Sequence, residues 1–505
     1  MQSENVARGA SLLIIQSMAA YLLSFSFYIL IARVLGSTEV GKLSILLMVS
    51  SVFSLTGLSI NYALQKFIPA FTEKQEYDKT SSLIRTSIVI LTTISTTALV
   101  ILLTLGAQIS TILFGTASDT APVIIILLAT FIVNFTAVFG GAMLGFGKFK
   151  DTAILNILNA GLSRILAVFL AALGLGLIGV TLGWLVAALA TLGFSIYVLR
   201  HNLHLKKKGF PAKQLLEYSL PVHVFTIITF IQAWADVAVL YAISTNLSQI
   251  GTYYLVISGA AILSLFYQPI SMAILPALSH RYVQHGVNGI KPMIEAYIKL
   301  TCKILIPVGV AFAALSATAL ETAYGPQYVS GAMPFAILVA TAIIPALSLL
   351  TVTIIQSIGN TRPLIIVGIT SSIADIALVA SLANPLGGVA GIAGRVAFST
   401  VGLVLGYLFI RSKIKLNILP ELKKPIAAAA AIATPLYILD QYLTQTVNLS
   451  SRLRAPVDIA AFVVVAATFT YLTRYITTDD MSIVKQAMPT QLRRTVNKIE
   501  KIIVR

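Results

Sequence analysis

Long runs of apolar residues separated by short polar stretches dominate this chain of 505 residues. The runs show no strict alternation of apolar and polar positions, and they are far longer than the roughly 10 residues of a membrane β-strand. An α-helix needs about 20 apolar residues to cross roughly 30 Å of hydrocarbon. The pattern therefore predicts an all-α polytopic membrane protein of about fourteen transmembrane helices, at residues 10–32, 40–64, 83–105, 121–143, 152–174, 178–199, 217–241, 250–275, 294–318, 330–355, 362–383, 388–410, 424–444 and 456–475.

A short motif between the first two apolar runs returns about 210 residues later. Residues 39–43 (EVGKL) resemble residues 249–253 (QIGTY), and each copy follows one apolar run and opens the next. This periodicity predicts two pseudo-symmetric six-helix lobes, inserted as parallel repeats, with the function located where they meet. Three further pairs share nearly the same offset: Phe114-Gly115 with Tyr324-Gly325, Gly147-Lys148 with Gly359-Asn360, and Gly179-Val180 with Gly388-Val389.

The repeat and its connecting segments predict five parts of the chain. These are an N-terminal six-helix lobe at 1–199, a basic cytoplasmic linker at 200–216, a C-terminal six-helix lobe at 217–411, appended helices 13 and 14 at 412–475, and a basic amphipathic cytoplasmic tail at 476–505. The tail carries an apolar stripe at helical spacing opposite basic residues, which favours a helix on the anionic inner leaflet. An ordinary solvated tail is the alternative.

Composition and charge agree with this topology. The chain is 57% apolar and only 10% charged, with a mean hydropathy of +0.91, which excludes an ordinary soluble surface. Its net charge is +17, and 29 of its 35 Lys and Arg residues fall on one side of the predicted topology. This bias predicts a multi-pass protein of the cell membrane with both termini in the cytoplasm. Nucleic-acid binding is not needed to explain the charge, and the lone Cys302 excludes a disulfide framework.

Motifs for nucleotide, metal or hydrolytic chemistry do not support an enzyme. Gly36-x-x-x-x-Gly41-Lys42 nearly matches a phosphate-binding loop, but Leu43 replaces the magnesium ligand and no strand precedes it. The sequence has no HExxH, CxxC or nucleophile-elbow motif, so we expect no cofactor and no metal site. Pairs of small residues predict close helix packing instead: Gly141/Gly145, Gly179/Gly183 and Gly402/Gly406.

Charges inside the predicted helices are the most informative residues. Each costs roughly 2.5 to 3.5 kcal/mol at mid-membrane, so each should face a partner or a wet cavity. Arg164 and Asp375 lie 211 residues apart at similar depth, which makes them near-equivalents of opposite sign in the two repeats. Asp236 and Arg395 lie in the outer halves of their helices. The four residues either form structural ion pairs or line a polar cavity, where arginines hold an anion and carboxylates take up a proton or sodium ion.

Several motifs resemble the polysaccharide-transporter (Wzx-like oligosaccharide flippase) family of the MATE/MurJ (MOP) superfamily. The resemblance spans predicted helices 1 to 12 and implies two six-helix lobes around a central cavity, which move lipid-linked sugars outward by alternating access. One departure is Val237, because many relatives carry Arg after the helix 7 aspartate, so a local Asp-Arg role is not carried over. The motifs are RVLGSTEVGKL (33–43), GFGKFK (145–150), Asp236 followed by QIGTYY (249–254), AYGPQY (323–328) and SIGNTRP (357–363).

This resemblance favours a flippase for a polyprenyl-type phosphate-linked oligosaccharide that acts as a monomer among membrane lipids. The candidate head-group ligands are Arg164, Arg395, Arg33 and Lys42, and the candidates for coupling to H⁺ or Na⁺ are Asp236 and Asp375. A cation-coupled multidrug exporter of the MATE type is the main alternative. A membrane glycosyl polymerase or ligase is disfavoured, because such enzymes usually need a large outer loop and the predicted outer loops are short.

Overall fold

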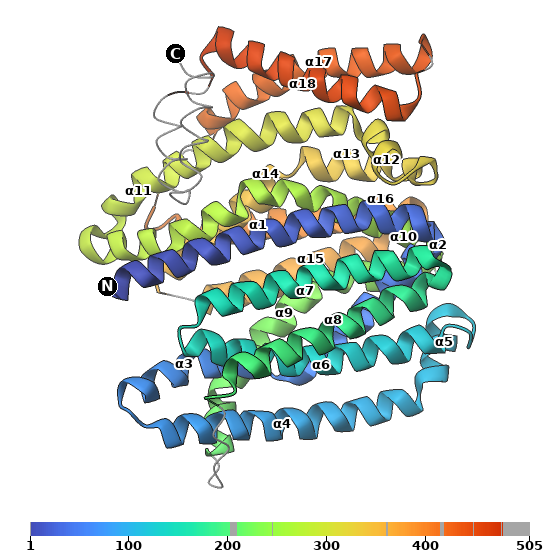
Figure 1. Cartoon of the computed structure of the whole chain (residues 1–505). Helices are drawn as coiled ribbons and strands as arrows, with labels where there is room; N and C mark the ends of the chain where they lie inside the picture. Colours follow the sequence, from blue (N-terminus) through green and yellow to red (C-terminus); the bar gives the residue numbers. More distant parts are fainter. Residues whose placement is uncertain are drawn as a thin grey trace. The chain divides into compact units, whose positions relative to one another are not determined.

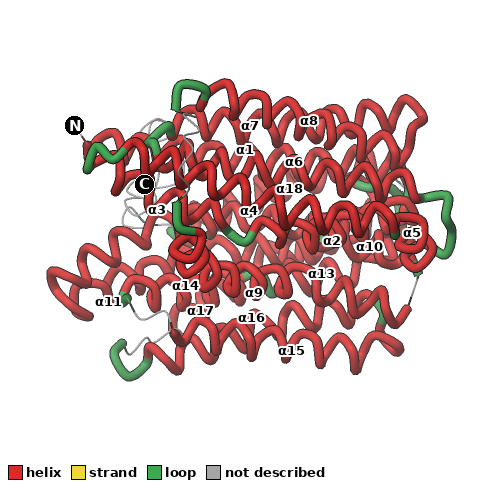
Figure 2. Tube along the Cα trace, turned by 90° about the horizontal axis from the view of Figure 1, so that it is seen from below, coloured by secondary structure: helices red, strands yellow, loops and turns green. Residues whose placement is uncertain are grey.

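Helices account for nearly all of the described chain in the computed structural model, which covers residues 2–202, 210–244, 246–359, 362–414, 419–447, 449–475 and 477 (Figure 2). No strand occurs in these ranges, and the all-α prediction is confirmed. The predicted helix of the tail at 476–505 lies outside the described residues, apart from residue 477, as do residues 203–209 of the predicted linker.

The described helices run along the chain from α1 to α18 (Figure 1). The first half contains α1 (Gln2–Leu35), α2 (Ser37–Ser54), α3 (Ile60–Glu73), α4 (Tyr77–Thr104), α5 (Gly106–Phe114), α6 (Thr120–Gly145), α7 (Phe149–Leu170) and α8 (Gly176–Leu199). The second contains α9 (Ala212–Ser244), α10 (Leu247–Ala260), α11 (Gln268–Ala314), α12 (Ser316–Ala323), α13 (Ala332–Ala340), α14 (Ile343–Ser357), α15 (Arg362–Leu386) and α16 (Gly388–Ile410), and is followed by α17 (Leu419–Gln445) and α18 (Ser451–Thr473).

Twelve helical segments of the described residues are long and apolar enough to cross a membrane. Two further helical segments, Pro326–Ala340 and Ile343–Ser357, meet at a bend of 42°. Counted together as one broken span, they bring the number of candidate membrane spans to thirteen. One of the twelve, Phe149–Leu199, contains both α7 and α8, which reverse direction at Gly174 (φ 93°) and pack against each other. The protein is therefore a multi-pass membrane protein. The count of fourteen is not confirmed and requires α7 and α8 to be counted separately.

Two predicted spans, 250–275 and 294–318, are wrong in their boundaries. The first breaks after α10 into a 3₁₀ segment, Ala261–Phe266, and a new helix begins at Gln268. Pro269 occupies its first turn, where the missing N–H needs no helical partner. The helix α11 then continues through the predicted inner loop to Ala314, with a kink at Gly286, whose φ of 60° suits glycine alone.

Basic residues at or beyond the ends of the apolar runs also lie in helices. Arg33 lies in the last turn of α1, Lys42 follows the start of α2 by five residues, and Arg454 lies in the first turn of α18. Since a helix forms its hydrogen bonds within its own segment, it can continue past the apolar stretch into polar residues at the membrane surface. The apolar pattern therefore marks the membrane-crossing part of each helix and misses its polar ends.

The predicted helix 40–64 is interrupted in its second half. After α2 ends at Ser54, a 3₁₀ turn leads to Leu58 and Ser59, whose φ values of 49° and 54° are left-handed. The Ser59 hydroxyl contacts Nδ1 of His223 at 3.3 Å and the hydroxyl of Thr226 at 2.9 Å, both on α9. These side-chain contacts accompany a backbone conformation that non-glycine residues rarely adopt.

Contacts divide the chain into two units. Unit 1 comprises Met1–Ala238 with Asn246–Gly251, and unit 2 comprises Val239–Thr245 with Thr252–Arg505. In unit 1, α6 packs against α2, α3, α4 and α8, around a core that includes Leu64, Leu91 and Met143. The lobe boundaries predicted at residues 199 and 217 stay predictions.

The small residues predicted to allow close packing do so in both units. A Cβ atom on Gly141 would lie 2.6 Å from the Asn61 carbonyl oxygen, and one on Gly183 would lie 2.5 Å from the Ala167 nitrogen. In unit 2, one on Gly406 would lie 2.1 Å from the Thr351 hydroxyl. At Gly141 and Gly183 two backbones thus approach more closely than a side chain would permit, and at Gly406 the absent side chain makes room for Thr351.

Candidate functional site

Arg164 lies on α7, where it is half-buried and held by neutral oxygen atoms. Its Nε and Nη2 donate to the Ser24 hydroxyl of α1 at 3.1 and 2.7 Å. Its Nη1 donates to the Ala160 carbonyl oxygen at 3.1 Å and to the Ser163 hydroxyl at 3.4 Å. Ser24 in turn donates to the Ala20 carbonyl oxygen at 2.7 Å. These bonds fix the direction of the guanidinium.

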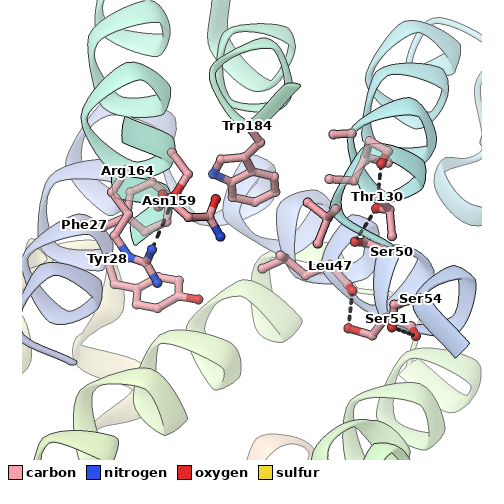
Figure 3. A pocket seen from close by; sticks show the side chains of 14 residues that line it. Phe27, Tyr28, Leu47, Ser50, Ser51, Ser54, Thr130, Asn159, Arg164 and Trp184 are labelled. Atoms are coloured by element: carbon pink, nitrogen blue, oxygen red, sulfur yellow. Dashed lines mark hydrogen bonds between the residues drawn. The ribbon is translucent and has the colours of Figure 1, made fainter. Parts of the chain in front are cut away.

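A cavity of about 280 Å³ opens beside this guanidinium, entirely within unit 1. Helices α1, α2, α6, α7 and α8 all contribute to its wall. Figure 3 shows Arg164 with Asn159, Tyr28 and Trp184 on one side and serine and threonine hydroxyls on the other. The lining residues are Phe27, Tyr28, Leu47, Ser50, Ser51, Ser54, Ile126, Ala129, Thr130, Val133, Asn159, Ser163, Arg164 and Trp184.

The hydroxyl side of the cavity is built from α2 and α6. The Ser50 hydroxyl contacts that of Thr130 at 2.6 Å, and Thr130 donates onward to the Ile126 carbonyl oxygen at 2.7 Å. Ser51 and Ser54 bond to carbonyl oxygens within α2. A hydroxyl whose proton goes to its own helix keeps acceptor capacity, so this wall can accept hydrogen bonds from a polyhydroxylated ligand.

The aromatic side of the cavity comes from α1 and α8. The Phe27 ring lies 5.2 Å from Tyr28 and 6.3 Å from Trp184, measured between ring centroids. Tyr28 and Trp184 each combine a flat apolar surface with a polar group at the edge. Such rings provide contact area for the apolar face of a sugar ring while their polar groups serve its hydroxyls.

The other candidate residues of unit 1 do not line this cavity. Arg33 is exposed in the last turn of α1. Lys42 pairs with Glu39 at 2.8 Å and with Asp119 at 3.0 Å, so its charge is balanced by two carboxylates. Asp236 is fully buried on α9, and its Oδ1 accepts a hydrogen bond from the Val237 amide at 2.8 Å. Only Arg164 among these candidates is a wall residue.

Asp375 and Arg395 belong to unit 2. Asp375 is 1% exposed on α15 and lies directly against α16, since a Cβ atom on Gly394 would be 2.2 Å from its Oδ1. Arg395 is the next residue of α16, and its Nε donates to the Tyr253 hydroxyl at 3.4 Å. These two candidates thus lie on adjacent, closely packed helices of unit 2.

The spacing of polar residues in the sequence carries a further signal for the wall residues, beyond the insertion cost of Arg164. Asn159, Ser163 and Arg164 are spaced at i, i+4 and i+5, so they fall on one face of α7. Ser50, Ser51 and Ser54 likewise interrupt an apolar run. A polar stripe on a membrane helix indicates a wet surface, whereas Trp184 and Tyr28 have no such signature.

The chemistry that this cavity supports is the binding of an anion attached to a polar group. Arg164 can donate charge-assisted hydrogen bonds to phosphate oxygens, which are roughly twice as strong as neutral ones. The volume lies near the lower end of the range for small-molecule sites, so it suits a phosphate and an adjoining ring rather than a whole oligosaccharide. Within the described ranges, no group of three or more His, Cys, Asp or Glu residues could hold a metal ion.

Comparisons with solved structures reveal the fold class. An inward-facing MATE-family multidrug resistance transporter of the MOP superfamily matches with a TM-score of 0.65 at 17% identity, over 80% of this chain and 95% of that one. The lipid II flippase MurJ, inward closed, matches with a TM-score of 0.65 at 15% identity, over 90% and 98%. A MOP superfamily transporter from Pyrococcus furiosus, described as having a binding pocket of reverse polarity, matches with a TM-score of 0.56 at 16% identity. The match covers 81% of this chain and 96% of that one.

The fold and the polar cavity thus define a multi-pass membrane protein with the transporter fold of the MOP superfamily. These structural neighbours are transporters or flippases rather than enzymes. A comparison with curated proteins gives no match. The family described as "Polysaccharide biosynthesis protein" matches residues 6–281, more than half of the chain. The chain belongs to this family, and the family resemblance carried by its sequence motifs is confirmed.

Proposed function

We propose that this protein is a flippase that moves a polyprenyl-type phosphate-linked oligosaccharide from the cytoplasmic to the outer leaflet, for assembly of a surface polysaccharide or glycoconjugate. The family supports a role in polysaccharide biosynthesis, and the fold supports alternating access. The observation that carries the proposal is Arg164 in the wall of a cavity rich in hydroxyl groups and aromatic rings. A cationic wall suits a phosphate head group, whereas a cavity for cationic drugs would be lined by acids.

In this proposal the cavity holds the head group while the lipid tail stays in the bilayer. The guanidinium of Arg164 binds the phosphate, Asn159 and the hydroxyls of α2 bind the first sugar, and Trp184 and Tyr28 contact its ring. Movement of the lobes then exposes the cavity to the outer side. We further infer from the charge bias that both termini are cytoplasmic in the cell membrane and that one chain suffices for transport.

The experiment uses proteoliposomes with a fluorescent polyprenyl-diphosphate oligosaccharide and a membrane-impermeant quencher that reports its leaflet. Arg164→Ala should abolish flipping and leave insertion intact, because removal of a costly buried cation does not hinder insertion. Arg164→Lys should retain part of the rate, since the charge remains but the forked geometry is lost. Arg200→Gln, a change at an exposed residue that ends α8, is the matched control.

The same samples separate the flippase from the MATE-type exporter. Wild-type protein that leaves the labelled oligosaccharide in its original leaflet but extrudes a cationic dye along an ion gradient would replace our proposal with the exporter. Normal flipping by Arg164→Ala would remove the proposed role of this cavity.

A further inference from the structure

A buried cluster of charges holds α18 against α17 and α12, within unit 2. Nη2 of Arg454 contacts Oε2 of Glu321 at 3.2 Å, and its Nε contacts Oδ1 of Asp440 at 3.3 Å. Its Nη1 donates to the Thr444 hydroxyl. Each of the three helices therefore supplies a polar or charged group to this cluster.

The cluster is almost closed to its surroundings. Asp440 and Arg454 are each 5% exposed, and Asp458, one turn after Arg454 on α18, is 2% exposed. The Thr318 hydroxyl of α12 donates to Asp440 at 2.6 Å. The Glu321 side chain, 31% exposed, lies partly open, and Thr444 is exposed at the edge of the cluster.

Asp458 differs from the other members of the cluster. Both of its carboxyl oxygens are buried and lack a hydrogen-bond partner, although its group interacts electrostatically with Asp440 and Arg454. A buried carboxylate normally accepts two or more hydrogen bonds, because water no longer stabilises its charge. The charged form of Asp458 is therefore poorly accommodated here.

The charge count leads to the same conclusion. The charged groups that act on Asp458 are Asp440 from α17 and Arg454 from α18 itself, and Arg454 also contacts Glu321 from α12. One arginine thus stands against three carboxyl groups, and it already contacts Glu321 and Asp440. Two neighbouring carboxylates that share one counter-charge favour uptake of a proton by one of them.

We propose that Asp458 is a proton-binding site that carries a proton when α18 is docked and shares it with Asp440. The neutral acid gains a donor, and its hydrogen bond to Asp440 joins α18 to α17. Loss of this proton would leave two anions facing each other between the helices. Proton binding at this site therefore stabilises the packing of the appended helix pair on α12.

A proton fits the site better than a metal cation. In the described part of the chain, no three acidic, histidine or cysteine side chains converge as a metal would require, and this holds for Asp440, Asp458 and Glu321 as well. Sodium would need several further oxygen ligands, whereas a proton needs only the two carboxyl groups. The proposal does not depend on the transported substrate.

The test is the pH dependence of the thermal unfolding of the full-length protein in detergent, in sodium-free choline buffer. Asp458 is protonated in the folded state and ionised above about pH 4 in the unfolded state. Unfolding then releases a proton, so the folding equilibrium should weaken by about tenfold per pH unit until the folded site itself ionises. The apparent Tm of the wild type should fall as the pH rises through this window.

Asp458→Asn should remove this part of the pH dependence. Its apparent Tm should match or exceed that of the wild type at high pH, since the amide still donates to Asp440 but carries no charge. Asp151→Asn, at a half-buried position in the first turn of α7, is the matched control and should keep the wild-type slope. Asp440→Asn provides a second variant, which should also flatten the profile because it removes the facing anion. Equal slopes in the wild type and in these two cluster variants would overturn the proposal, as would a slope that appears only when sodium is added.

Discussion

Gly41 and Gly251, which occupy equivalent positions in the two sequence repeats, lie directly against each other. A Cβ atom on Gly251 would lie 2.7 Å from the Gly41 nitrogen and 2.1 Å from the Ser37 carbonyl oxygen, and one on Gly41 would lie 1.9 Å from the Leu247 carbonyl oxygen. The hydroxyls of Ser37 and Ser248, which precede the two glycines by four and three residues, are 2.7 Å apart. The motif that revealed the repeat is thus a self-complementary crossing between the first turns of α2 and α10.

This crossing should not tolerate a side chain. Gly41→Ala should lower the apparent Tm, because the added methyl group must push two helix backbones apart, and overpacking of this kind costs about 1 to 3 kcal/mol. Gly251→Ala should act in the same direction. Thermal unfolding in detergent measures both effects.

Gly193→Ala is the control for this prediction. Gly193 lies in α8, and a Cβ atom added to it would have no neighbouring atom within 4 Å. Alanine there should be neutral or stabilising by about 0.5 to 1 kcal/mol, because glycine is the poorer helix former. Equal destabilisation by alanine at Gly41, Gly251 and Gly193 would show that the close contact between α2 and α10 does not require glycine.

Trp184 should contribute to ligand affinity through the aromatic wall of the cavity. Trp184→Ala should weaken binding of a polyprenyl-diphosphate oligosaccharide by about tenfold, or about 1.4 kcal/mol, since it removes the largest ring that lines the site. Binding to protein in nanodiscs is the measurement. Trp234→Ala changes the other tryptophan of the chain, on α9 and outside the cavity wall, and should leave the affinity unchanged.

Asp236 and Asp375 remain candidates for ion coupling. Asn at either position keeps the size of the side chain and loses its titration. If the replaced aspartate carries the coupling ion, its Asn variant should flip substrate independently of an imposed H⁺ or Na⁺ gradient, at unchanged expression. Flipping is measured with and without the gradient. Persistence of the gradient effect in both variants would assign these buried acids a structural role.

The turn between α3 and α4 offers a stabilising change. Gln75 is exposed and has a φ of 58°, a conformation that strains residues with a Cβ atom by about 1 to 2 kcal/mol. Gln75→Gly should therefore increase the free energy of unfolding by about 0.5 kcal/mol, after the conformational entropy of glycine is subtracted, and so raise the apparent Tm. Gln75→Ala keeps the strain and should not stabilise the protein.

The sequence predicted the helical class and most of the membrane-crossing segments, because apolar length follows directly from bilayer thickness. The spans at 121–143, 178–199 and 388–410 differ from α6, α8 and α16 by at most two residues at either end. The interruption at Leu58 and Ser59 was missed, since the contacts to His223 come from α9, far away in the sequence. Local pattern carries no information about such a partner.

The candidate site was predicted only in part. The insertion cost of a charge singled out Arg164, yet Asp440 and Asp458 carry the same cost and were not predicted as functional residues. Lys42 looked like a cavity cation because its partner Asp119 follows it by 77 residues and was not recognised. A single sequence reveals which charges need a partner, but packing decides whether that partner is another side chain or a ligand.

The turn at Gly174 determines which residues face each other across the cavity. Arg164 precedes this glycine by ten residues and Trp184 follows it by ten, so the cation and the indole are paired by the register of one helical hairpin. Each residue of an α-helix turns by about 100° and rises by 1.5 Å. A single insertion between Ala171 and Leu175 would lengthen the turn and change the register of α8 against α7, and with it the position of the indole opposite Arg164, while both helices stayed whole. The length of this turn therefore helps to define the cavity, although none of its residues lines the wall.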